Sequence, residues 1–144
     1  MSNTDHYVDV ADAIVAKLKA MTDPKFTDVY YGDQTIIPMS PAAVVEPGGI
    51  ERTLEGINIM TVNAIIVTIT VYHASIAETQ ITKRDCDLDA QKVVDELHSD
   101  TQMGDTVIFG YCTKVDSGYS MKGGALQYAT RIEWEGTTKT MIGA

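Results

Sequence analysis

The chain has 144 residues, a length that suits one domain, and we predict a single domain over residues 1–144. Hydrophobic residues make up 44% of the sequence and charged residues 22%, which is typical of a globular chain and not of a disordered one. Because 11 Lys and Arg stand against 20 Asp and Glu, the net charge is -9, which argues against tight nucleic-acid binding.

The apolar runs and the cysteine count narrow the cellular setting. No apolar run approaches the roughly 20 residues of a membrane span. The first five residues lack the basic and apolar regions of a signal peptide, so we expect a soluble protein with no membrane partner. Cys86 and Cys112 are too few for a disulfide framework and predict two free thiols in a reducing compartment.

The first segment of the chain predicts a helix. Between residues 5 and 22, apolar side chains recur at spacings of three and four, which places them on one helical face. Asp23-Pro24 is expected to end this helix, because the residue before proline disfavours helical angles. A short strand is predicted over residues 27–31.

The next segment is the most β-like part of the sequence. We predict a short strand over residues 42–46 that ends at a break, Pro47-Gly48-Gly49. Branched residues dominate residues 52–73 and favour strand structure there. This span predicts either a hairpin with a turn near Gly56 or Asn63, or one long strand that extends beyond the body of the domain.

The second half repeats the order of helix and strands. A helix is predicted over residues 82–99, with a buried stripe of Leu88, Val93, Val94 and Leu97. Strands are expected over 106–115, 126–134 and 137–142, separated by turns that include Ser117-Gly118 and Glu135-Gly136. The predicted fold is therefore α+β: a mostly antiparallel sheet with two helices packed on one face, and extended loops or strands that reach neighbouring subunits.

Acidic residues in the second helix resemble part of a calcium-binding loop. Asp85, Asp87, Asp89 and Glu96 have suitable spacing, but Ala90 stands where that loop needs glycine for its sharp turn. We interpret these residues as an acidic first helical turn, which interacts favourably with the helix dipole.

Other reactive side chains form no recognisable motif. His6, His73 and His98 lack neighbours at zinc-ligand spacing, and Cys112 lies in a strand pattern typical of a buried thiol. We therefore expect no enzyme activity, cofactor or metal. A small α+β enzyme or ligand-binding domain stays open as an alternative, since catalytic residues can be distant in sequence.

Several segments, taken in order, carry a resemblance to a known family. They are the N-terminal helix, Thr27–Tyr31, Ile37-Pro38-Met39, Val44–Gly49, Val93–His98, Val107–Tyr111, Val115–Tyr119 and Arg131–Gly136. In this order and over this length, the chain resembles the tail terminator (tail-completion) proteins of long-tailed bacteriophages.

The resemblance implies a virion structural protein, assembled in the host cytoplasm and placed at the head-proximal end of the tail. Such proteins form a ring, usually of six copies, that caps the tail tube and offers the surface on which the head connector docks. The implied partners are further copies of the chain, the tail-tube protein and the connector or neck protein, while DNA only passes through the lumen. A head-closure or neck protein, or a tail-tube subunit, is the alternative within the same class.

If a ring forms, we expect residues 33–56 and the long β segment to contribute to contacts with neighbours or the tube. The candidate contact residues are Ile37, Met39 and Val45. We expect Ile37→Asp and Met39→Asp to prevent particle assembly.

Overall fold

The structure is a computed structural model that describes residues 7–32, 34, 41–54, 60–74, 79–122 and 124–141. Within these ranges the elements are α1 (Tyr7–Lys19), β1 (Asp28–Tyr31), β2 (Ala42–Leu54), β3 (Met60–Ala74), α2 (Thr79–His98), β4 (Phe109–Lys122) and β5 (Ala125–Met141). The strands form one sheet in the order β1-β2-β3-β5-β4. β1 and β2 are parallel and the other neighbours are antiparallel, which confirms the predicted α+β class with a mostly antiparallel sheet.

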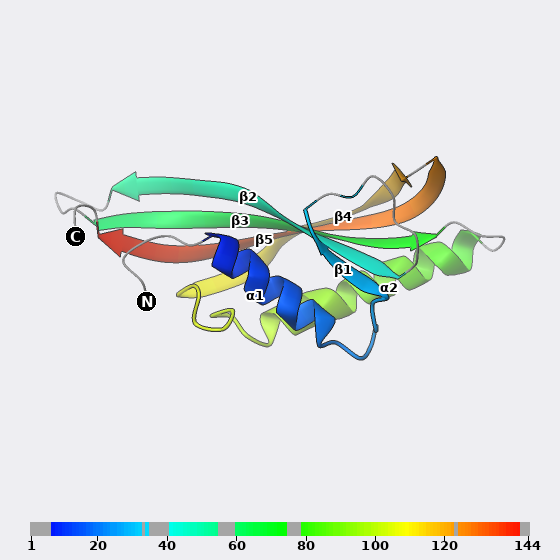
Figure 1. Cartoon of the computed structure of the whole chain (residues 1–144), viewed down its shortest axis with the longest axis horizontal. Helices are drawn as coiled ribbons and strands as arrows, with labels where there is room; N and C mark the ends of the chain where they lie inside the picture. Colours follow the sequence, from blue (N-terminus) through cyan, green and yellow to red (C-terminus); the bar gives the residue numbers. More distant parts are fainter. Residues whose placement is uncertain are drawn as a thin grey trace.

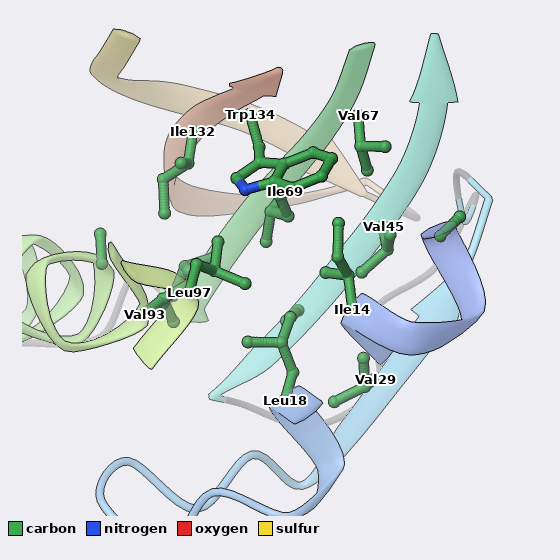
Figure 2. Packing of buried hydrophobic residues seen from close by; sticks show 14 of the residues in the cluster. Ile14, Leu18, Val29, Val45, Val67, Ile69, Val93, Leu97, Ile132 and Trp134 are labelled. Carbon is green, nitrogen blue, oxygen red and sulfur yellow. The ribbon is translucent and has the colours of Figure 1, made fainter. Parts of the chain in front are cut away.

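The long strands run along the longest axis of the molecule, and α1 and α2 lie on the same side of them (Figure 1). Side chains of both helices and of one sheet face form a single hydrophobic cluster (Figure 2). We call this side of the sheet the helix face and the opposite side the open face. On the open face, a smaller cluster of Ala42, Val44 and Tyr72 is buried.

The helices bury the faces that their apolar spacing creates. In α1, Val10, Ala11, Ile14 and Leu18 are buried, as the predicted helix requires. In α2 the buried stripe consists of Cys86, Ala90, Val93 and Leu97. The placement of Leu88 in that stripe is wrong, because two residues of helix turn its side chain roughly 200° from Cys86, and it is exposed.

β2 continues through the segment that we expected to break it. Pro47-Gly48-Gly49 forms a β-bulge, at which the register with β3 shifts by one residue. β1 pairs only with Ala42–Val45, so the missing N–H of Pro47 is tolerated on an edge that no other described strand covers. Gly49 has a φ of +101°, which a side chain would strain.

β2 and β3 form the hairpin that was one of the two predictions for residues 52–73. Residues 55–59 connect them, so the possible turn at Gly56 lies outside the described residues. A turn at Asn63 is wrong: Asn63 is fully buried within β3, and its amide donates to Thr138 Oγ1 at 3.1 Å.

The expected turns at Ser117-Gly118 and Glu135-Gly136 are also wrong, because β4 and β5 run through them. Gly136 serves close packing instead of a turn. A Cβ atom there would lie 2.5 Å from the ring of Trp134, and one at Gly110 would lie 2.1 Å from the same ring. Trp134 is fully buried, so these two glycines create the space for its indole beneath the sheet.

Candidate functional site

Exposed apolar side chains concentrate on β4, which is an edge strand of the sheet. They are Phe109, Tyr111, Val115, Tyr119 and Met121, each about half exposed or more. A long edge strand with exposed apolar side chains is a template for pairing with another chain. β4 is therefore the part of the described surface best suited to binding a protein partner.

The exposed side chains of β4 divide between the two faces of the sheet. Phe109 and Tyr111 alternate with residues that face Trp134, so they project from the open face, with ring centroids 5.9 Å apart. A bulge between Cys112 and Lys114 shifts the alternation by one residue. Beyond it, Val115, Tyr119 and Met121 project on the helix face.

Part of the β4 edge is already covered by the chain itself. The N–H of Gly110 donates to the carbonyl of Thr101 at 2.7 Å, and the N–H of Cys112 donates to Nε2 of His98 at 2.9 Å. These two bonds show that the backbone of residues 110 and 112 points away from β5.

Antiparallel ladders alternate inward and outward residues, and the bulge shifts this alternation. The outward residues beyond the bulge are therefore Val115, Ser117, Tyr119 and Met121. Within the described residues, no other strand lies beside this part of β4.

At the opposite edge of the sheet, the outer side of β2 is likewise paired over only part of its length. The N–H of Gly32 donates to the carbonyl of Val45 at 2.8 Å, so the backbone of Val45 points toward β1. Across the bulge of β2 the alternation continues with Ile50, Arg52 and Leu54 as the outward residues. Among the described strands none covers this stretch of β2, and the side chain of Leu54 is 62% exposed.

A shallow groove of about 350 Å³ runs beside the free part of β4. It is lined by Gln91, Val94 and Asp95 of α2 and by Val115 of β4. Side chains of a strand added to β4 would enter this groove on the helix face, where Val94 and Val115 offer apolar contact. Backbone pairing and side-chain contact are thus available at the same place.

A cluster of polar side chains connects α2 to the sheet. Asp87 accepts hydrogen bonds from Lys83 at 3.0 Å, Ser117 at 3.1 Å and Thr130 at 3.0 Å, and Lys83 also donates to Ser117 at 2.7 Å. Burial raises the pKa of Asp87, but these hydrogen bonds outweigh burial and hold its pKa below the ordinary value. The bond to Asp87 raises the pKa of Lys83.

A Ser–Lys pair acts as a nucleophile only when the lysine is neutral and can take the serine proton. Lys83 is held protonated by Asp87, and Ser117 itself donates to the carboxylate. The cluster is therefore a structural connection between α2, β4 and β5.

His73, Asp89 and the two cysteines lie outside this cluster. His73 Nε2 lies 2.6 Å from Asp89 Oδ2 in a largely buried hydrogen bond between β3 and α2. Both cysteines are free, as predicted; burial raises the pKa of Cys86, and it raises that of Cys112 to about 11. In the described part of the chain, no three His, Cys, Asp or Glu side chains are grouped to hold a metal ion.

The open face carries a hollow of about 530 Å³ between β2 and β4. Its lining includes Glu46, Asp116, Lys122 and Arg131, two acidic and two basic side chains. Lys122 lies over the ring of Tyr72, 5.5 Å from its centroid. Acidic and basic side chains are thus equally represented among the charged residues of its lining.

The three contact residues expected from the sequence have different outcomes. Ile37 and Met39 lie outside the described residues. Val45 is fully buried, and it points toward α1 on the same side of the sheet as Ile14 and Leu18 (Figure 2). Its assignment as a surface contact is therefore corrected: the side chain packs in the core of its own chain.

The apolar edge of β4 was missed at the level of the sequence. The signal was present, because residues 109–121 carry apolar side chains on both strand faces while the helices can cover only one. The expected turn at Ser117-Gly118 divided this segment and hid its length.

No protein-family model matches the chain, and no curated protein matches it at a significant level. Neither helix in the described ranges is long and apolar enough to cross a membrane.

Proposed function

We propose that the chain is a virion structural protein, a tail terminator that forms a ring on the finished tail tube of a long-tailed bacteriophage. The ring, of six copies in the family that the sequence resembles, stops tube growth and provides the docking surface for the head connector. The proposal joins that resemblance to one structural observation: among the described strands, both edges of the sheet have stretches with no neighbouring strand, and one of them displays a row of exposed apolar side chains.

Two different adhesive edges on one subunit favour a ring. When one patch binds a different patch on the next copy, the contact is head-to-tail, and it closes into a ring if the rotation between copies allows. β4 and the part of β2 beyond its bulge lie at opposite edges of the sheet, so one copy can contact two neighbours at once.

The charge of the chain suits a channel that DNA traverses without being held. A net charge of -9 gives little attraction for phosphates, and an acidic wall repels them weakly. In this proposal DNA passes through the lumen and is not a ligand.

Electron microscopy of phage particles made without this protein tests the proposal. A tail terminator is required to stop tube growth and to join the head, so we expect overlong or headless tails. Normal tails with heads that leak DNA would contradict the proposal and indicate a head-closure protein instead. Purified wild-type protein, mixed with tail-tube protein, is expected to give rings or capped tube ends in the same microscope.

A further inference from the structure

We propose that the copies join by strand addition: the part of β4 beyond its bulge in one copy pairs with the part of β2 beyond its bulge in the next, so that the sheet continues from subunit to subunit. The inference rests on the proposed ring and names the surfaces that close it. The occupant of the β4 edge is thus a second copy of this chain.

The two edges place the side chains of their outward residues on the same face of the sheet. The outward residues of β4 beyond its bulge and those of β2 beyond its bulge all project their side chains on the helix face. When two strands pair, residues opposite each other share a face, so these two edges meet without a mismatch. Val115, Tyr119 and Met121 of one copy then lie across from Ile50 and Leu54 of the next.

The directions of the two strands also allow them to pair. The steps from β2 to β3, from β3 to β5 and from β5 to β4 are each antiparallel. β4 therefore runs opposite to β2, and a neighbouring copy related by rotation about an axis along the strands presents β2 antiparallel to β4. This is the same ladder that the rest of the sheet uses.

The strands in the two halves of the sheet differ in their charged residues. Among the described strands, β1–β3 carry three acidic residues, Asp28, Glu46 and Glu51, against one basic residue, Arg52. β4 and β5 carry four basic residues, Lys114, Lys122, Arg131 and Lys139, against three acidic ones, Asp116, Glu133 and Glu135. The excess of acidic residues on β1–β3 makes two β2 edges of different copies repel each other, which favours the pairing of β2 with β4.

The first residues of β4 cannot pair with a neighbouring copy, because other parts of the same chain already bind their outward N–H groups. His98 and Thr101 occupy the outward N–H groups of Cys112 and Gly110, so the neighbour can pair only beyond the bulge. The stretch of β4 from Lys114 to Lys122 matches in length the stretch of β2 from Glu46 to Leu54, and among the described strands no further strand pairs with the outer edge of either one.

Paired proline and alanine variants test the junction by native mass spectrometry. Tyr119→Pro removes an outward N–H of β4 and leaves the ladder with β5 intact, whereas Tyr119→Ala removes the same side chain but keeps the N–H. Leu54→Pro and Leu54→Ala form the matching pair on β2, at an outward residue of that strand. Under the condition in which the wild-type protein forms rings, alone or with tail-tube protein, we expect the alanine variants to assemble and the proline variants to stay monomers of 15.7 kDa.

Mixing the two proline variants separates head-to-tail pairing from its alternatives. Each variant retains one intact edge, so the 1:1 mixture is expected to form a species of two chains and no ring. Proline variants that form wild-type rings, or a mixture of folded variants that stays monomeric, would overturn the strand addition.

Hydrogen exchange on the wild-type protein tests the junction without any variant that must fold. The amides of Val115, Ser117, Tyr119 and Met121 are expected to be protected in the ring and to exchange quickly at dilutions where the ring dissociates. Fast exchange in the ring would overturn the junction.

The two proposals fail in different ways. A ring whose edges stay unprotected removes the strand addition but leaves the terminator function. An edge-paired assembly that does not cap tubes removes the terminator function but leaves the strand addition.

Discussion

The space beneath the sheet for Trp134 makes Gly110→Ala the most informative single substitution for the fold. The new Cβ would lie 2.1 Å from Cζ2 and 2.7 Å from Cε2 of the indole. The ring cannot move aside, since it is fully buried and Gly136 already brings the backbone of β5 close to its other edge. β4 or the indole must therefore shift, as in an overpacked core.

Overpacking of this kind costs about 1–3 kcal/mol. The lower chain entropy of alanine in the unfolded state offsets 0.4 to ~1 kcal/mol of that cost. We expect Gly110→Ala to lower the free energy of unfolding by about 1–2 kcal/mol, which for a chain of this size lowers Tm by roughly 2–8 °C.

The matched control lies on the same strand. A Cβ at Gly118 meets no atom within 4 Å, so Gly118→Ala is expected to leave stability unchanged or to raise it by up to ~1 kcal/mol. Both variants are compared with the wild type by urea unfolding at one protein concentration, because assembly would couple stability to concentration. Equal effects of the two substitutions would refute the packing argument.

Three further substitutions or reactions test other parts of the structure. The pKa of Asp87 is lowered on folding, so its contribution to the free energy of unfolding is present above its ordinary pKa and is lost as pH falls through the lowered value. Asp87→Asn should therefore lower the free energy of unfolding by roughly 0.5–1 kcal/mol at neutral pH, and urea unfolding should show this difference vanishing in acid. With a pKa of about 11, only about one Cys112 thiol in a thousand is ionised at pH 8, so mass spectrometry should find its alkylation by iodoacetamide roughly ten- to a hundredfold slower than in the denatured chain; equal rates would contradict the raised pKa of this partly buried thiol. Val45→Asp buries an unpaired carboxylate and should abolish the folded circular-dichroism spectrum, whereas a folded variant that only fails to assemble would restore Val45 as a contact residue.

The sequence predicted the elements whose patterns are set locally. The apolar spacing in residues 5–22 found α1, and the branched residues of 52–73 found β3 and the end of β2. Each of these patterns arises because one face of a single helix or strand is buried, so it can be recognised without knowing which element packs against that face.

The errors concentrate at glycine and proline. Pro47-Gly48-Gly49 is a bulge on an uncovered edge, and Gly136 makes room for Trp134. In both places the residue type is required by a contact with another strand or with a packed side chain, which a local turn pattern cannot reveal. The edge of β4 was missed for the same reason, because its position in the sheet depends on pairing with β5.

The central claim is that this chain works by assembling with copies of itself into a ring. The mass of the native wild-type protein, measured with and without tail-tube protein, tests it most directly. We expect a closed assembly whose mass is a whole multiple of the 15.7 kDa chain, six copies in the family that the sequence resembles, either alone or on the tube. A chain that stays monomeric in both conditions would contradict the account.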